Sequence, residues 1–157
     1  MDKINQILNN EKYKNYLSKL IELEEDREFC KHNIEHFLDT ARISYIQVLE
    51  KKLNYSKEVV YGAALLHDIG RVEQYINNIP HDVASVSIAK EILCETDYST
   101  DEIKKILLCI SNHRNENQNE LSKIFYKSDK ISRNCFNCNA EDKCYWEKSK
   151  KNFSITY

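Results

Sequence analysis

The sequence predicts an all-α protein, a bundle of six or seven helices, on the strength of three observations. The chain of 157 residues contains only two glycines and one proline, whereas β-sandwiches and barrels use many such residues at their turns. Apolar residues recur at a spacing of three to four through most of the chain, which is the period of a helix. With 41% apolar residues the chain can bury a core, so a fully disordered protein is excluded.

The N-terminal part of the sequence predicts two stretches of helix. Residues 2 to about 24 follow the helical period, and the Asn9-Asn10 pair divides them into two pieces. The same period continues from Glu28 to Leu53, which predicts one long helix over that range.

The middle of the chain predicts a buried helix followed by a loop. Ser56 is a suitable N-cap for a helix from Lys57 to about Asp68, where small residues beside leucines suit burial on most sides. Gly70 can then end this helix in the left-handed conformation. Residues 71–80 contain asparagines and the proline, so we expect them to be irregular.

The second half of the chain predicts three further helices. The first covers residues 81–94. The second begins at Ser99, which has the spacing of a capping box with Glu102, and it extends to residue 113. After a polar, asparagine-rich loop, the last helix covers residues 121–132.

The elements group into one domain and a short tail. The helical domain is expected over residues 1–134, with its core at about 28–132, and a cysteine-rich tail, residues 135–157, is expected to pack on it. The aromatic residues of the tail are numerous enough for this packing, although they could instead mark a homodimer contact.

Charge and hydropathy exclude several classes of protein. The 23 basic and 25 acidic residues nearly balance, which argues against bulk nucleic-acid binding. No run of 18 apolar residues is present, and the N-terminus lacks the apolar region of a signal peptide, so no membrane association is expected. We expect a cytoplasmic protein whose six cysteines are reduced.

Histidines and aspartates form the most informative pattern in the sequence. Imidazole and carboxylate together suit divalent transition metals, and a carboxylate can bridge two ions. His67 and Asp68 are adjacent and stand in the stretch A-A-L-L-H-D-I-G-R, which begins at Ala63. A buried aspartate beside a buried histidine needs a strong partner, and a cation is a suitable one.

These residues resemble the HD-domain superfamily of metal-dependent phosphohydrolases. The stretch from Ala63 is close to the A-L-L-H-D-I-G-K signature of that family, with Arg71 in place of its frequent lysine. His36 looks like the first histidine of the family, and three later positions are similar to its remaining ligands, in the same order: His81, His113 and Asp129. The resemblance spans about residues 28–132.

The resemblance implies a helical bundle with a metal site at its centre, as in the dinuclear members of the family. The ligands implied for the first ion are His36, His67, Asp68 and Asp129. The second ion would be held by His81 and His113, with Asp68 bridging. The ions would be Fe, Mn, Co, Ni or Zn. From the residues alone, His81 could instead be a surface residue at a helix start, and His113 a helix-end residue favoured by the dipole.

Such a site implies hydrolysis of a phosphomonoester, a phosphodiester or a nucleotide phosphoanhydride by metal-bound hydroxide. The expected partner is thus a nucleotide or another phosphorylated small molecule. Asp68 would bridge or orient, and the guanidinium of Arg71 or Arg114 could hold a phosphate, although both could equally be surface charges. The alternatives are a non-catalytic nucleotide, metal or redox sensor and, more weakly, a di-iron oxygenase of the same fold.

Two further residues are expected to support the first ion. His32 precedes His36 by four positions, so both would share a helix face, and His32 would line the site. Asp39 stands where many family members carry an arginine, one helical turn after His36, and could orient that histidine as a hydrogen-bond acceptor.

The tail carries a second candidate metal site. Cys135, Cys138 and Cys144 form C-x2-C-x5-C, and C-x2-C is a usual spacing for zinc. Cys30 is a candidate fourth ligand. It lies six residues before His36, as Cys135 lies six after Asp129, so antiparallel helices would bring both to one end of the bundle.

The other interpretations of these cysteines are packing residues and a redox-responsive cluster. Cys94 and Cys109 are expected in the core, because they lie on apolar helix faces.

Overall fold

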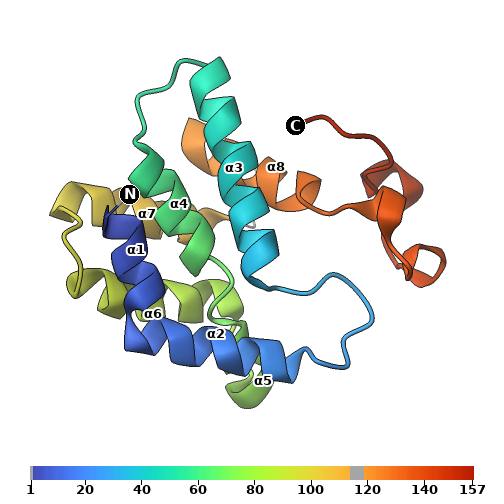
Figure 1. Cartoon of the computed structure of the whole chain (residues 1–157), viewed down its shortest axis with the longest axis horizontal. Helices are drawn as coiled ribbons and strands as arrows, with labels where there is room; N and C mark the ends of the chain where they lie inside the picture. Colours follow the sequence, from blue (N-terminus) through green and yellow to red (C-terminus); the bar gives the residue numbers. More distant parts are fainter. Residues whose placement is uncertain (1, 114–118) are drawn as a thin grey trace.

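The computed structural model describes residues 2–113 and 119–157, and within them it contains helices and no β-strand. Figure 1 shows how the helices follow one another. The α-helices are α1 (Asp2–Asn9), α2 (Glu11–Leu23), α3 (Ile34–Glu50), α4 (Lys57–Leu66), α5 (Arg71–Asn77), α6 (His81–Cys94), α7 (Thr100–Asn112) and α8 (Glu120–Ile131). Within the described residues no helix is both long enough and apolar enough to cross a bilayer.

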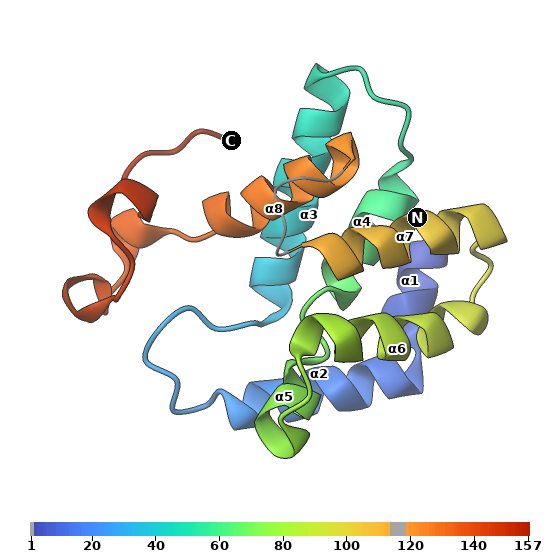
Figure 2. The same cartoon turned by 180° about the vertical axis from the view of Figure 1, so that it is seen from behind.

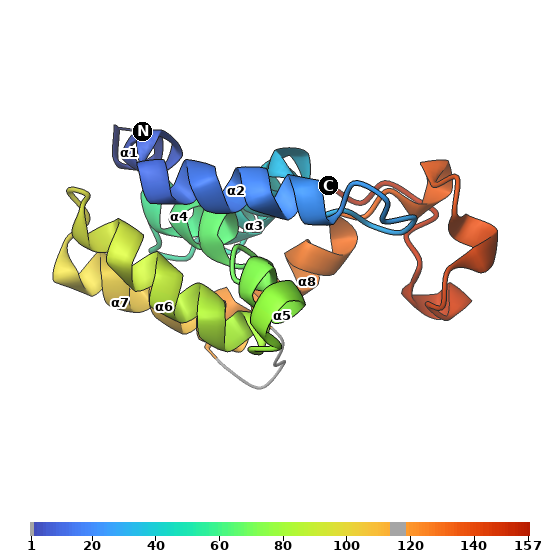
Figure 3. The ribbon, with the colours of Figure 1, turned by 90° about the horizontal axis from the view of Figure 1, so that it is seen from below.

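Helix α4 occupies the centre of the molecule. It packs against α1, α3 and α7, and Figure 3 shows α1 and α7 on its two sides. Seven of its residues, from Val59 to Leu66, are buried, which confirms the prediction of a helix enclosed on most sides. The site described below lies where this central helix ends.

Side-chain caps define several helix boundaries as the sequence predicts. Asn10 interrupts the N-terminal helix, because its side chain accepts the backbone N–H of Tyr13 at 3.1 Å and begins α2. Ser56 caps α4, and Ser99 forms a complete capping box with Glu102 at the start of α7.

The prediction of one helix from residue 28 to residue 53 is wrong at its start. Helix α3 begins at Ile34, after the N-cap Asn33, and residues 24–33 form a linker. The backbone N–H of His32 donates to the carboxylate of Glu24 at 2.6 Å, so the side chain of the residue that caps the end of α2 satisfies a donor that a helix would otherwise use. His32 and His36 therefore do not share a helix face, although both lie near α4.

The prediction for residues 70–80 is also wrong in two respects. Gly70 has φ −72°, so it is not left-handed. The chain continues into the short helix α5, which packs on α2 and α6 and buries Val72. Asn78 adopts the left-handed conformation instead, with φ 56°, and ends α5. Helix α5 is the addition that brings the described residues to eight α-helices.

The tail projects from the bundle beyond the end of α8, as Figures 1 and 2 show. Its longest regular elements are the three-residue turns η1 (Cys135–Asn137), η2 (Glu141–Lys143) and η3 (Lys148–Lys150). It contacts the linker through the ring edges of Phe29 and Tyr145, whose centroids lie 6.0 Å apart. The division at residue 134 and the packing of the tail as a unit stay predictions.

Candidate metal centre

Histidines and aspartates from the ends of five helices converge beside α4. His67 and Asp68 follow α4 directly, so the buried central helix itself positions the pair. His36 lies in the first turn of α3 and Asp129 in the last turn of α8. His81 begins α6, and His113 caps the end of α7.

The first group of candidate ligands consists of His36, His67, Asp68 and Asp129. One ligand atom from each residue lies within 4.8 Å of the others. The Nε2 of His36 is 3.2 Å from Oδ1 of Asp129, and the Nε2 of His67 is 3.2 Å from Oδ2 of Asp68. The structure thus brings together the four residues that the resemblance assigns to one ion.

The second group consists of Asp68, His81 and His113. The other oxygen of Asp68, Oδ1, lies 3.4 Å from Nε2 of His81 and 3.8 Å from Nε2 of His113. Asp68 therefore turns one carboxylate oxygen toward each group, which is the arrangement of a bridging ligand. His81 and His113 are both buried, which excludes a surface position for either of them.

Each imidazole of the two groups is oriented by a hydrogen bond at its Nδ1. The Nδ1 of His67 donates to the carbonyl of Ala64 at 2.8 Å, and that of His113 donates to the carbonyl of Ile110 at 2.5 Å. The Nδ1 of His81 lies 2.7 Å from Oε1 of Gln74. These contacts fix a proton on Nδ1, so Nε2 is the atom that each ring turns toward the centre and would offer to a metal ion.

The chemistry of this donor set fits divalent cations. Nε2 of His81 and Nε2 of His113 approach to 3.2 Å, and two facing lone pairs need a positive charge between them. Among the described residues, Nε2 of His67 and Oδ1 of Asp129 are buried without a partner in hydrogen-bond geometry. Orphaned buried acceptors of this kind are costly unless they have a ligand.

The pKa shifts show how strongly the charges interact. Burial alone would lower the pKa of His67, but the carboxylates of Asp68 and Asp129 raise it to about 9. Burial opposes the ionisation of Asp68, yet His67 and Arg71 hold the pKa of Asp68 well below its usual value. The centre therefore keeps its carboxylates ionised and attracts positive charge.

Ser132 takes the position that Asp39 was expected to fill. The Nδ1 of His36 donates to the Ser132 hydroxyl at 3.0 Å, and that hydroxyl donates to the carbonyl of Asp129 at 2.7 Å. Asp39 pairs instead with Arg42 on the outer side of α3, at 3.4 Å. The prediction for Asp39 is wrong because it considered α3 alone, whereas the partner of His36 comes from the end of α8.

His32 approaches the first group from the linker. Its Nε2 lies 3.6 Å from Oδ2 of Asp68, and its Nδ1 contacts Oε1 of Glu24 at 2.6 Å. Burial opposes ionisation of Glu24, but hydrogen bonds from His32 and Tyr75 lower the pKa of Glu24 to about 2. The sequence does not reveal the role of Glu24, since nothing in the local pattern at the end of α2 distinguishes it from the exposed acidic residues around it.

A cavity of about 160 Å³ opens beside the first group. Three arginines line it: Arg27 from the linker, Arg71 from the start of α5 and Arg133 from the end of α8. Asp129 and His32 also line it. The sequence predicts Arg71 and Arg114 as the phosphate-binding residues. Arg114 lies outside the described residues, and Arg27 and Arg133 carry no signal in the sequence.

The guanidinium group of each arginine in this cavity donates at least one hydrogen bond to a neighbouring protein group. The Nε of Arg71 donates to Oδ1 of Asp68 at 2.8 Å, and the Nε of Arg27 donates to the carbonyl of Cys30 at 2.9 Å. Arg133 donates to the carbonyl of Lys31 at 3.0 Å and to Nε2 of His36 at 3.1 Å. The three guanidinium groups concentrate positive charge beside the carboxylates.

The cysteines occupy a neighbouring position. Four of them line a second cavity, which His36 also borders: Cys30, Cys135, Cys138 and Cys144. Cys109 is buried, as expected, whereas Cys94 is exposed at the end of α6 and the prediction of a core position for it is wrong.

Comparison with known proteins agrees with this geometry. The family model described as HD domain matches residues 33–134, which contain every member of both ligand groups. The chain is 45% identical, over the full length of both chains, to an uncharacterized protein of Clostridium beijerinckii. No solved structure matches. With the family model covering most of the chain and the His and Asp residues gathered as that family requires, this protein belongs to the HD-domain family.

Proposed function

We propose that the protein is a metal-dependent phosphohydrolase that cleaves the phosphoester or phosphoanhydride bond of a nucleotide or a similar phosphorylated small molecule. One observation carries this proposal: two groups of metal-ligand type share Asp68, and a cavity lined by three arginines opens beside the first group. Ligands for cations and donors for anions within one site suit a phosphate group. The HD-domain family, to which the chain belongs, is a superfamily of metal-dependent phosphohydrolases.

Two divalent ions are proposed, one for each group. The first would be held by His36, His67, Asp68 and Asp129, and the second by Asp68, His81 and His113. When bound, such ions lower the pKa of water and stabilise the charge that develops on phosphoryl oxygens. Fe, Mn, Co, Ni and Zn all accept this mixture of imidazole and carboxylate.

The arginines are proposed to hold the phosphate group. A guanidinium presents donors in a planar fork that matches phosphate oxygens. Arg71 is anchored through Nε, which leaves its terminal nitrogens as donors for the cavity. Phe29, Tyr145 and Trp146 border the same cavity and offer aromatic surface for a base or another flat group.

His32 is proposed to move a proton during the reaction. Its contact with Glu24 places a proton on Nδ1, so Nε2 is the atom that it presents toward Asp68. Burial lowers the pKa of His32, against the effect of Glu24, so the imidazole is neutral near pH 7. A neutral Nε2 at this position can accept a proton from the attacking water.

The proposal is tested by a screen of metals and substrates. The purified protein is loaded with Mn²⁺, Fe²⁺, Co²⁺, Ni²⁺ or Zn²⁺ and offered phosphomonoesters, phosphodiesters and nucleotides, with release of phosphate or nucleotide as the readout. The expected result is turnover with at least one metal, abolished in a His67→Ala variant. Absence of turnover with every metal, while His67→Ala still folds and loses a bound nucleotide, would favour the sensor. Oxygen consumption would indicate the oxygenase.

Replacing Glu24 with Gln tests the role assigned to His32. We expect kcat/KM to fall about 10- to 100-fold, because the imidazole loses the carboxylate that orients it. Stability should fall as well. The pKa of Glu24 is lowered from 4.5 to about 2. The Glu24 carboxylate therefore contributes to the free energy of unfolding above pH 4.5, and this contribution is lost as the pH falls toward 2. Urea unfolding should therefore separate the variant from the wild type at pH 7 and much less at pH 3.

Glu25→Gln is the matched control for this experiment, since its side chain is exposed and only its backbone carbonyl accepts a hydrogen bond, from Lys31. It should retain both activity and stability. An equal effect of the two substitutions would show that Glu24 acts only through the general charge of the segment.

Replacing Arg27 with Met tests the phosphate-binding cavity. We expect KM to rise about tenfold or more with a smaller change in kcat, because a hydrogen bond to a charged group is worth about 1.5–3 kcal/mol. Arg27 is the suitable choice, since Arg71 and Arg133 also contact residues of the metal centre. Steady-state kinetics with the best substrate of the screen provides the measurement.

Arg42→Met removes an exposed arginine of α3 that pairs with Asp39, and it serves as the control. Its KM should equal that of the wild type. If Arg27→Met left KM unchanged, the cavity would not be the phosphate site. The cytoplasmic location, the homodimer contact and the absence of bulk nucleic-acid binding stay predictions from the sequence.

A further inference from the structure

We propose that Cys30, Cys135, Cys138 and Cys144 bind a structural Zn²⁺ ion that fastens the C-terminal tail to the linker before α3. This site is separate from the metal centre, and the proposal does not depend on the hydrolase function. It assigns a role to residues 135–157, all of which lie outside the match to the HD-domain model.

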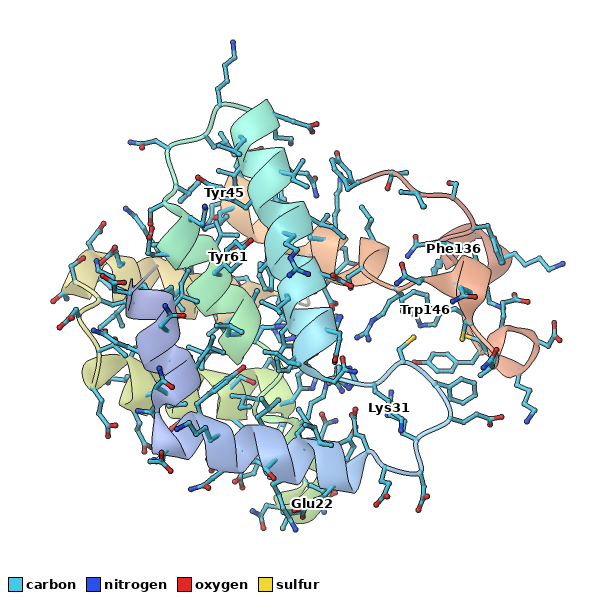
Figure 4. All side chains as sticks on the ribbon, in the orientation of Figure 1. Glu22, Lys31, Tyr45, Tyr61, Phe136 and Trp146 are labelled. Atoms are coloured by element: carbon cyan, nitrogen blue, oxygen red, sulfur yellow. The ribbon has the colours of Figure 1, made fainter. Side chains whose placement is uncertain are left out.

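The four cysteines come together from segments that are far apart in the sequence. Cys30 belongs to the linker, and the other three belong to the tail. All four are partly buried free thiols, and all four line one cavity of about 210 Å³. Figure 4 shows sulfur atoms between the linker, which carries Lys31, and the part of the tail that carries Trp146. The tail and the linker thus place all four thiols on one cavity wall.

The η1 turn of the tail joins two cysteines at the C-x2-C spacing of zinc-binding pairs, and a second turn, η2, precedes Cys144. The backbone N–H of Cys138 donates to the carbonyl of Cys135 at 3.3 Å across η1. The backbone N–H of Cys144 donates to the carbonyl of Glu141 at 3.1 Å across η2. Tight turns at a C-x2-C spacing bring two sulfur atoms to the same side of the chain, and four cysteines complete the tetrahedral set that structural zinc prefers.

The tail has too little apolar core to be held by packing. Of residues 135–157, only Ala140 is buried, and large apolar side chains such as Tyr145 and Phe153 are exposed. Segments below about 40 residues usually need a disulfide or a metal ion to keep a defined structure. Because the cysteines are free thiols, a metal ion is the device that these residues can supply.

Lys151 and Arg133 line the cysteine cavity and would offset part of the charge of four thiolates, although Glu35, Asp39 and Glu141 line it too. The side chain of Lys151 is 6% exposed, and its ammonium group donates to the carbonyl and the carboxylate of Glu141. Glu141, together with the thiols of Cys144 and Cys135, raises the pKa of Lys151. Burial raises the pKa of the Cys30 thiol, and Arg133 opposes that shift, so zinc would have to displace the thiol proton when it binds.

Binding requires the thiols to move closer together. Among the described residues, only the two His and Asp groups have ligand atoms within 4.8 Å of one another, so the four sulfur atoms do not yet form a ligand set. A change of one cysteine rotamer moves its sulfur by about 3 Å, so side-chain rotation within the cavity can bring the thiolates to a common ion.

The proposed zinc site would also hold part of the wall of the cavity that the three arginines line. Cys30 and Cys144 border that cavity as well as the cysteine cavity, and Tyr145 and Trp146 follow Cys144 directly. An ion between Cys30 and the tail would therefore hold the aromatic wall of the proposed substrate cavity in place. Loss of zinc should then weaken substrate binding without removing the metal centre.

The test uses zinc content and zinc coordination in a chain whose metal centre is disabled. Asp68→Asn is the background, because zinc could also enter the metal centre of the wild type. Protein purified under reducing conditions is analysed by mass spectrometry of metals and by X-ray absorption at the zinc edge. We expect one zinc ion per chain with four sulfur neighbours at about 2.3 Å.

Cys138→Ser in this background should lower the zinc content at least tenfold, whereas Cys94→Ser should leave it unchanged, because Cys94 is exposed at the end of α6, outside the cluster. Limited trypsin digestion is a second measurement, and it remains informative if the variant is partly misfolded. In Cys138→Ser the tail should be cleaved about tenfold faster, while the helical domain persists as a resistant fragment.

Three results would overturn the proposal. The first is zinc with only nitrogen and oxygen neighbours in the Asp68→Asn chain. The second is a zinc content that Cys138→Ser does not change. The third is a disulfide among the four cysteines in cells lysed into an alkylating agent. A protein that hydrolyses no substrate could still show the four-sulfur zinc site, so failure of the proposed function would be recognised separately.

Discussion

The Asp68→Asn variant is expected to lose both metal ions and at least about a thousandfold in kcat/KM. Asp68 turns Oδ2 toward the first ligand group and Oδ1 toward the second. Asparagine has nearly the same shape, but it replaces one oxygen by an amide donor and removes the negative charge that both groups share. The stabilisation that metal ions contribute to a phosphoryl-transfer transition state amounts to several kcal/mol. Metal analysis and steady-state kinetics measure the two losses.

Asp39→Asn is the matched control, since it is the same substitution one helical turn from His36. Asp39 pairs with Arg42, and Ser132 holds His36 in its place. The control should keep its metal content and its activity within about twofold. Retention of both ions by Asp68→Asn would contradict the bridging role. A large loss in Asp39→Asn would restore the role that the sequence suggested for that residue.

The Gly70→Ala variant is expected to unfold at a markedly lower temperature, with a loss of about 3 kcal/mol. A Cβ atom at position 70 would lie 2.5 Å from the carbonyl oxygen of His81 and 2.3 Å from the backbone nitrogen of Ser85. These are backbone atoms of α6, so the contact can be relieved only by moving that helix. Displacement of α6 would also move His81, so the second ion should bind more weakly. Calorimetry and metal titration test both expectations.

Gly62→Ala is the control because it also adds a methyl group at a close helix contact. At that position the Cβ atom would meet the end of the Ile106 side chain at 2.9 Å and the hydroxyl of Tyr98 at 3.0 Å. Both can shift, and alanine favours the helix by up to about 1 kcal/mol over glycine. The net change should be small. If the two variants were equally stable, close approach of α6 would not explain Gly70.

The comparison of the two glycines shows what a local interpretation of sequence misses. Gly70 follows the helix end as a left-handed glycine would, and its position in the sequence alone suggested that conformation. Its φ of −72° is accessible to any residue. What requires glycine there is α6, whose backbone at His81 and Ser85 leaves no room for a Cβ atom and whose Ser85 hydroxyl accepts the Gly70 N–H at 2.9 Å. That contact joins residues that are separated by a loop and a short helix.

The start of α3 shows the same limit. The apolar period from residue 28 is helical, and nothing in it indicates a break before Asn33. The buried carboxylate of Glu24 binds the backbone and the imidazole of His32, and this tertiary contact holds the linker in another conformation. Helix propensity contributes less free energy per residue than the hydrogen bonds of a buried carboxylate. The contact with Glu24 therefore determines the conformation of the linker.

The sequence alone was enough to predict the helical class, most helix boundaries and the residues gathered at the metal centre. The helical class and the boundaries are encoded within one or two turns of the chain, as the apolar period and the caps at Asn10, Ser56 and Ser99. The resemblance to the HD-domain family identified the residues of the metal centre. The tertiary structure alone decided that Ser132 holds His36, that Glu24 holds His32, and that Arg27 and Arg133 join Arg71 around one cavity. The partners in these contacts come from different elements, and only the packing of those elements determines which side chains meet.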